Sequence, residues 1–272
     1  MIEPAEMRSL VRRHIHLWKT ATHAEWRACF APDYRIEDPV GTGARFMGSY
    51  AEEWENMHAA ALQLDMEVYR LTVGGREIVA DLRAVTHLQE TGRGANQADG
   101  ARYAISYTGI YTLDESGLLC ANRTFADPVS DELWKAFYPT LPAPGERDPL
   151  PRSPADLRQA VEDHLFFWNV GERDAWRRRF REDAVIEDPV GSGPCELGDA
   201  RVLWERRHAQ DTRVFLGCHR TIVCGMEVLA HTVQVTETKG APARTSANTE
   251  IFAFDSDGRI ASWRVFRDED SP

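Results

Sequence analysis

The chain has 272 residues, of which 43% are hydrophobic and 28% are charged, as is usual for a globular protein. Its formal net charge of −11 disfavours nucleic acid and anionic membrane surfaces as partners. The sequence has no signal-peptide pattern, no apolar run long enough to cross a bilayer and no zinc-type spacing among its five cysteines, so we expect a cytoplasmic protein with reduced thiols.

The first half begins with helical patterns and ends with strands. Apolar side chains recur at helical spacing over residues 4–20, and Trp26 and Phe30 lie four apart in a shorter helix at 23–31. A third helix is expected at 49–63. β-rich runs separated by turns follow, with a polar, glycine-rich hairpin tip at 92–100. The expected strands are 64–71, 77–88, 103–113 and 118–125.

The second half repeats this order after a short helix at 130–138 and a stretch rich in proline. Its expected helices are 154–169, 173–181 and 199–210, and its expected strands are 213–224, 226–238, 245–254 and 259–266. Helices followed by an antiparallel meander indicate an α+β fold in each half. We therefore predict two domains, residues 1–138 and 154–272, joined by a proline-rich linker at 139–153.

One motif of eight residues occurs twice. Residues 36–43 read Ile-Glu-Asp-Pro-Val-Gly-Thr-Gly, and residues 186–193 differ only by serine for threonine. The same separation of 150 residues pairs histidines and aromatic residues on both sides of the motif, which indicates a tandem duplication. These pairs are His14 and His164, Trp18 and Trp168, Trp26 and Trp176, Phe30 and Phe180, Trp54 and Trp204, and His58 and His208.

This order of elements around the Glu-Asp-Pro-Val-Gly core resembles the ketosteroid isomerase/SnoaL-like (nuclear transport factor 2-like) superfamily. The resemblance covers both halves. It implies two tandem cone-shaped domains, each a curved antiparallel sheet wrapped with three helices around an apolar cavity. It also implies that Asp38 and Asp188 are general bases. Because a following proline disfavours helical backbone, each aspartate is expected at a strand end facing the cavity. The alternative is a turn aspartate that caps backbone amides.

The resemblance also implies positions for hydrogen-bond donors. His14 and His164 occupy the position of the family's helix-one tyrosine, and Gly109 and Glu250 occupy the position of its second acid. Asp188, His164 and Glu250 would thus make the fuller set of catalytic residues in the second half. The alternative for either histidine is a position in the core. The aromatic side chains expected in the core or at the cavity mouth, as candidates for substrate contact, are Trp18, Trp168, Trp54, Trp204, Phe30 and Phe180.

A second resemblance is to the tandem polyether epoxide hydrolases, which pair the motif aspartate with an acid on the first strand. Asp65 and Glu67 are two residues apart and therefore share a strand face. The second half has Phe215 and Gly217 instead, so this pairing with Asp38 is expected only in the first half. A solvated strand face is the alternative for both acids.

Three functions remain open from the sequence. The first is a cofactor-independent acid–base enzyme, an isomerase, cyclase or lyase, that acts on a small hydrophobic carbonyl compound of polyketide or steroid type. The second is an epoxide hydrolase or epoxide-opening cyclase, and the third a non-catalytic ligand-binding protein. No cofactor or metal motif is present in the sequence. The two domains are expected to form an intrachain pseudo-dimer, with further homo-oligomerisation left open.

Overall fold

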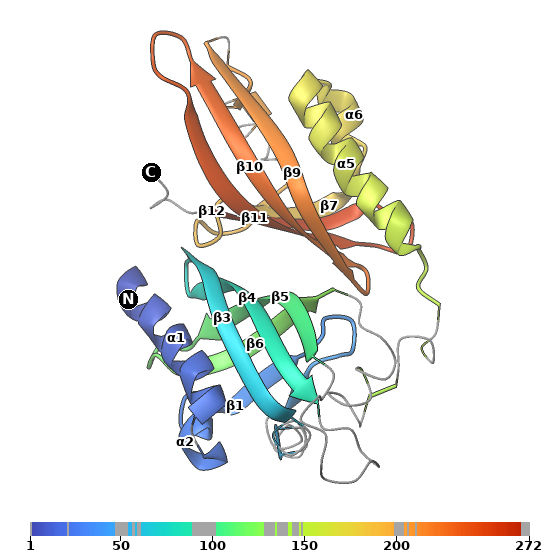
Figure 1. Cartoon of the computed structure of the whole chain (residues 1–272). Coiled ribbons are helices and arrows are strands. Elements are labelled where there is room, and N and C mark those ends of the chain that lie inside the picture. The colour runs from blue at the N-terminus through green and yellow to red at the C-terminus, as the bar shows by residue number, and fades with distance from the viewer. Residues whose placement is uncertain are drawn as a thin grey trace. The chain divides into compact units, whose positions relative to one another are not determined.

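The computed structural model describes residues 2–20, 22–46, 54–55, 58, 61–88, 102–127, 134, 141–142, 147, 149–198, 204–205, 207–209 and 211–267. They divide into two compact units, whose sheets come from the first and second halves of the chain (Figure 1). The predicted linker at 139–153 lies partly outside the described residues, as do the helix predicted at 130–138 and the hairpin tip at 92–100. The domain boundaries therefore stay predictions.

The described part of the first half contains two helices and six strands. They are α1 (Pro4–Thr20), α2 (His23–Arg27), β1 (Phe30–Glu37), β2 (Arg45–Phe46), β3 (Ala61–Gly74), β4 (Glu77–Leu88), β5 (Arg102–Leu113) and β6 (Leu119–Ala126). The second half repeats the order. Its elements are α5 (Pro154–Val170), α6 (Arg173–Arg177), β7 (Phe180–Glu187), β8 (Cys195–Glu196), β9 (Thr212–Cys224), β10 (Glu227–Thr238), β11 (Arg244–Phe254) and β12 (Ile260–Arg267).

Both sheets have the same topology. Their strand orders are β2-β1-β6-β5-β4-β3 and β8-β7-β12-β11-β10-β9. The predicted antiparallel meander is present as β3–β6 and as β9–β12, with bounds within three residues of those expected. However, β1 runs parallel to β6, and β7 runs parallel to β12. The sheets are therefore mixed, and the prediction of purely antiparallel sheets was wrong.

The helices also differ from the prediction. Four helices, two in each half, are assigned among the described residues, rather than three per domain. Residues 49–63 and 199–210 lie mostly outside the described residues, although Trp54 and Trp204 are helical and Ala61 already starts β3. The helices predicted at 23–31 and 173–181 end earlier, because Phe30 and Phe180 begin strands.

Local chemistry explains the bounds of α5. Ser153 caps the helix, since its hydroxyl accepts from the Asp156 N–H and the Asp156 carboxylate accepts from the Ser153 N–H. Pro154 occupies the first turn, where no intrahelical N–H is needed. Gly171 ends the helix with φ 75°, a left-handed conformation that glycine adopts without steric cost.

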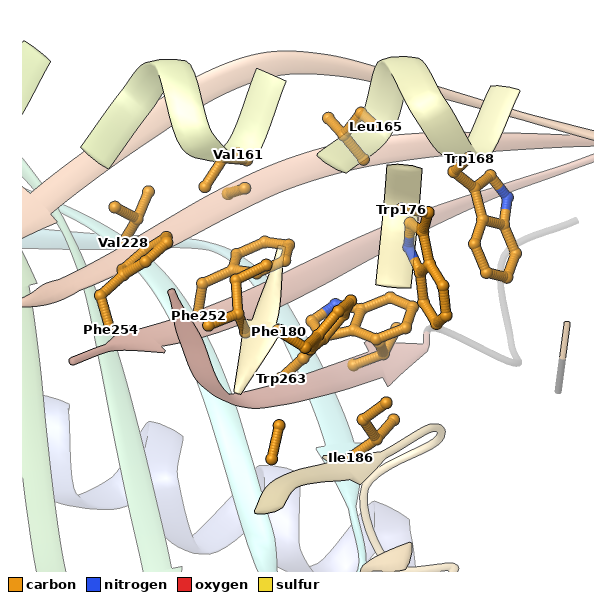
Figure 2. Packing of buried hydrophobic residues seen from close by; sticks show 14 of the residues in the cluster. Val161, Leu165, Trp168, Trp176, Phe180, Ile186, Val228, Phe252, Phe254 and Trp263 are labelled. Carbon is orange, nitrogen blue, oxygen red and sulfur yellow. The ribbon is translucent and has the colours of Figure 1, made fainter. Parts of the chain in front are cut away.

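One face of each sheet is covered by the long helix of its unit, and we call it the helix-covered face. In the second unit the core lies between this face and α5 (Figure 2). Side chains two apart on a strand share a face, so alternate residues of β7, β10, β11 and β12 point into this core. These include Ala184, Ile186, Val228, Ala230, Phe252, Phe254, Trp263 and Val265. In the first unit, His14 of α1 contacts Tyr111 of β5, which places α1 over the equivalent face.

Among the described residues, no helix has the length and apolar character that a membrane crossing requires. The same described ranges contain no group of three or more histidine, cysteine or acidic side chains arranged to hold a metal ion.

Candidate functional site

The repeated motif forms the same turn at the end of β1 and β7. Both Asp-Pro peptide bonds are cis. In the first half, Glu37 accepts a hydrogen bond from the Gly41 N–H (3.0 Å) and one from Arg123 Nε (2.9 Å). The carboxylate thereby ties both ends of the turn to β6, and Gly41 adopts φ 89°, where a side chain would be strained. The motif glutamate thus holds the segment that carries Asp38.

The second half repeats each of these contacts. Glu187 accepts from the Gly191 N–H at 2.9 Å and from Arg264 Nε at 3.1 Å. The backbone N–H after the proline also pairs with the neighbouring strand in both halves, Val40 with Thr124 and Val190 with Val265. The glutamate of the motif is therefore explained by the structure of the turn, and the aspartate beside it faces the opposite side of the strand.

In the first half, strand geometry brings Asp38 together with three tyrosines. Tyr34 lies four residues before Asp38 and shares its face, while Tyr107 and Tyr111 lie four apart on β5. β6 lies between these strands, and its Asn122 is opposite Tyr111 in the register. The Asn122 side chain is hydrogen-bonded to the Tyr34 hydroxyl. Asp38 is half-buried and the three tyrosines are buried or half-buried.

The electrostatics of this group favour neutral phenols. Burial raises the pKa of Tyr107 and of Tyr111, and the negative charge of Asp38 raises each further. Burial likewise raises the pKa of Tyr34, with additional contributions from Tyr111 and Asp38. A phenol that stays protonated is a hydrogen-bond donor. The helix-covered face of the first sheet therefore combines one carboxylate with buried O–H groups.

The first half lacks the second acid for a steric reason. At Gly109, a Cβ atom would lie 2.8 Å from a ring carbon of Tyr111 and 3.1 Å from its hydroxyl oxygen. A glutamate at this position, as in the second half, is incompatible with the tyrosine ring where it lies. The hydroxyl of Tyr111 instead lies next to the position that Glu250 has in the second half.

In the second half, Asp188 is held by arginine. Its side chain is 3% exposed, and Arg267 donates to both of its oxygens, from Nε and Nη2, at 2.7 Å. A second guanidinium, that of Arg207, lies 3.9 Å away. Arg267 also donates to Gln234 at 2.7 Å. The position of Arg207 corresponds to Met57 in the first half, and that of Arg267 corresponds to Ala126. Ala126 is opposite Tyr107 in the strand register, just as Arg267 is opposite Asn248.

Glu250 lies on the same face, buried to 1% exposure. Thr232 Oγ1 lies 2.6 Å from one carboxyl oxygen and Trp263 donates its indole N–H to the other at 2.8 Å. Burial raises the pKa of Glu250 against the effect of these two hydrogen bonds, and Asp188 raises it further. Glu250 thus lies on the same face as Asp188, whose negative charge raises its pKa. The arginine that pairs with Asp188, Arg267, was not predicted from the sequence.

The two helix-one histidines are buried among aromatic rings. His14 contacts Trp26, Phe30 and Tyr111, with ring centroids 5.1–5.6 Å apart. His164 is fully buried against Phe252 and Trp263, at 5.2 and 4.9 Å. Burial lowers the pKa of each histidine to about 3, so both rings are neutral at physiological pH. A neutral imidazole can donate one hydrogen bond, but it carries no charge to stabilise an anion.

The His164 pKa predicts acid lability. Its folded pKa of about 3 lies below the ordinary value of 6.5, so the unfolded chain binds the proton more tightly. Stability is then intact above pH 6.5 and falls as pH drops towards 3. At pH 5 this histidine should lower the free energy of unfolding by about 2 kcal/mol relative to pH 8. The check is urea unfolding of the wild type and of His164→Phe at pH 5 and pH 8. The change in the free energy of unfolding between the two pH values should be smaller in the variant. An equal change in both proteins would contradict the prediction.

The acids proposed for epoxide opening are not brought to Asp38. Asp65 is 62% exposed on its side chain and pairs with Lys19 at 2.6 Å, a contact that lowers its pKa. Glu67 is also exposed. Both belong to the solvated face of β3 rather than to the helix-covered face.

The aromatic candidates for substrate contact pack mainly on one another. Trp18, Trp168, Trp204, Phe30 and Phe180 are buried, and Trp54 is half-buried. His58 and His208 stack on the neighbouring tryptophan at 3.8 and 3.9 Å, and each ring bridges two backbone carbonyl groups of helical residues. These aromatic clusters connect the first helix of each half to Trp54 or to Trp204.

Several polar residues of both faces were not predicted from the sequence. In the first half they are Tyr34, Tyr107, Tyr111 and Asn122, and in the second half Thr232, Gln234, Asn248 and Arg267. Tyr107 and Tyr111 could have been found by extending the alternation from Gly109 to its neighbours two residues away on each side.

Comparison with protein families agrees with this architecture. Residues 11–122 match the SnoaL-like domain family model. The first half of the chain is a SnoaL-like domain. The predicted resemblance to this superfamily is confirmed, and the second sheet repeats the strand order of the first.

Solved structures similar to part of this chain include three enzymes. An LEH-like epoxide hydrolase of M. tuberculosis is 24% identical with a TM-score of 0.37, over 42% of this chain and 84% of that one. The epoxide hydrolase/cyclase-like enzyme SalBIII, which has a role in pyran ring formation in polyether salinomycin, is 22% identical with a TM-score of 0.39, over 42% of this chain and 92% of that one. The Δ5-3-ketosteroid isomerase of Mycobacterium sp. is 19% identical with a TM-score of 0.38, over 42% of this chain and 95% of that one. No curated protein matches the chain.

Proposed function

We propose that the first half catalyses proton transfer on a small hydrophobic carbonyl compound, with Asp38 as the base. The observation that carries this proposal is the placement of Asp38 on the helix-covered face with three buried or half-buried tyrosines whose pKa values its charge raises. A carboxylate and neutral phenols are the two kinds of group that an enolisation needs. Both are supplied by side chains, so the reaction requires no cofactor.

In this mechanism the Asp38 carboxylate removes a proton from the carbon next to the carbonyl group. Negative charge then develops on the carbonyl oxygen, where the hydroxyl of Tyr111 or Tyr107 donates a hydrogen bond. Such a bond is stronger in a desolvated site than in water. Protonated Asp38 returns its proton to the same carbon or to a conjugated one, and the second outcome is an isomerisation.

We assign the base to Asp38 rather than to Asp188, although the sequence gives the second half the fuller set of family residues. Both oxygens of Asp188 accept hydrogen bonds from Arg267, and the side chain is 3% exposed. Removing a proton from carbon requires a carboxylate oxygen within reach of that carbon. Asp188 would have to give up its arginine to provide one.

The proposal is tested with 2-tetralone, a bicyclic ketone with exchangeable hydrogens beside its carbonyl group. The full chain is incubated with this ketone in deuterated buffer, and deuterium incorporation is followed by proton NMR. We expect protein-dependent exchange at catalytic concentrations. Exchange no faster than in buffer alone would contradict the proposal and would favour the non-catalytic, ligand-binding alternative.

Tyr111 provides a sharper prediction within the same assay. Tyr111→Phe keeps the ring over Gly109 but removes the O–H donor, so the exchange rate should fall by roughly 100-fold. In the wild type, no loss of rate from tyrosine ionisation should occur between pH 8 and pH 10, because burial and Asp38 raise the pKa of Tyr111 and keep it protonated. A fall in rate with a midpoint below pH 10, or an active Tyr111→Phe variant, would rule out this role.

A further inference from the structure

The second half contains a buried amide that the proton-transfer proposal does not use. Asn248 of β11 is 1% exposed, and neither its Nδ2 nor its Oδ1 has a hydrogen-bond partner among the described residues. Nearly all buried polar side chains in proteins are hydrogen-bonded, so an amide lacking both kinds of partner requires an explanation. Leaving it unpaired destabilises the folded state.

The strand register fixes where this amide lies. Asn248 is opposite Thr232 on β10 and opposite Arg267 on β12. It shares the helix-covered face with Glu250, which is two residues further along the same strand. Asn248 is therefore surrounded by polar side chains on the same face as the protein core.

These neighbours are committed to other partners. Thr232 Oγ1 is 2.6 Å from Glu250. The guanidinium of Arg267 donates to Asp188 and Gln234, each at 2.7 Å. Trp263 donates to Glu250 at 2.8 Å. The polar groups around Asn248 thus satisfy one another, whereas its amide has no hydrogen-bond partner in the part of the chain that the structure describes.

We infer that the helix-covered face of the second half binds a small molecule through its carboxamide, lactam or urea group, with Asn248 as the recognition residue. Such a group presents a donor next to an acceptor in one plane, as Asn248 does, so two amides pair through two hydrogen bonds. A ketone offers no donor to Oδ1, and a carboxylate offers none either. This ligand class differs from the carbonyl compounds proposed for the first half, whose tyrosines supply O–H donors.

Three aromatic probes of similar size test the inference: benzamide, acetophenone and benzoate. The readout is the indole N–H signal of Trp263 in the nitrogen-15-labelled full chain, because this group donates to Glu250 on the same face. We expect benzamide, at concentrations up to roughly 10 mM, to shift this signal saturably. Acetophenone and benzoate should bind at least about tenfold more weakly. Equal shifts with acetophenone would mean that the face is merely apolar. Stronger binding of benzoate than of benzamide would mean that the arginines select the ligand. No shift with benzamide would mean that the face has no binding site. Each would overturn the inference.

Asn248→Leu is the matching variant. It should weaken benzamide binding at least about tenfold, the loss expected from leaving a ligand amide unpaired in a buried site. Without ligand its melting temperature should equal or exceed that of the wild type, because an unpaired amide is removed. A lower melting temperature would show that the amide has a partner inside the protein and would overturn the inference. Tyr107→Phe, at the corresponding position of the first half, should leave the Trp263 titration unchanged. The assay measures no turnover, so its failure is distinct from a failure of the proposed proton transfer.

Discussion

Replacing Arg267 with methionine should lower the free energy of unfolding by about 3–5 kcal/mol, the usual result of leaving one member of a buried ion pair without its partner. Asp188 would keep its burial, at 3% exposure, and lose both hydrogen bonds from Arg267. Arg207, at 3.9 Å, replaces only part of this interaction. The loss is measured by urea unfolding of the full chain, followed by tryptophan fluorescence.

Two variants make this result specific. The double variant Asp188→Asn/Arg267→Met removes both charges of the pair and should recover most of the lost stability, since neither partner is left as a buried charge without the other. Arg181→Met removes an arginine that also makes two hydrogen bonds to a carboxylate, Asp183, but on the surface. It should cause no measurable change, because solvent screens the exposed pair. If Arg267→Met lowers the free energy of unfolding by less than about 1 kcal/mol relative to the wild type, the ion pair does not hold Asp188.

The second large effect concerns catalysis. Asp38→Asn should reduce the rate of 2-tetralone exchange by about 10²–10⁴-fold, because an amide keeps the shape of the carboxylate but cannot accept a proton from carbon. The change falls on turnover rather than on binding. The dissociation constant for 2-tetralone, measured by ligand NMR, and the melting temperature should both stay close to those of the wild type. A variant that exchanges the ketone at the wild-type rate would exclude Asp38 as the base.

The sequence predicted most of the fold because the duplication allowed each pattern to be recognised twice. Alternation located the strands of the meander, and the repeat of the first half's helical pattern located α5. The parallel contacts of β1 with β6 and of β7 with β12 were missed, because these strands are distant along the chain and their pairing leaves no local signal. The pair Trp26 and Phe30 is four residues apart, as in a helix, yet Phe30 begins a strand and only Trp26 is helical.

The candidate site was predicted less completely, for a similar reason. The motif identified Asp38 and Asp188, but nothing near Asp188 in the sequence indicates that Arg267 holds its carboxylate. Arg267 lies 79 residues after Asp188 and reaches it only through the register of β12 beside β7. In the first half, the ring of Tyr111 lies where the missing acid would be. This replacement could be predicted only by knowing which residues share a face of the sheet.

The central claim is that Asp38, and not the Asp188 that Arg267 holds, is the base. It is tested most directly by measuring 2-tetralone exchange for Asp38→Asn and Asp188→Asn in parallel, at equal concentrations of folded protein. We predict a loss of about 10²–10⁴-fold for Asp38→Asn, and a rate within about twofold of the wild type for Asp188→Asn, whose amide oxygen still accepts from Arg267. Loss of exchange in Asp188→Asn with full activity in Asp38→Asn would place the base in the second half and contradict the claim.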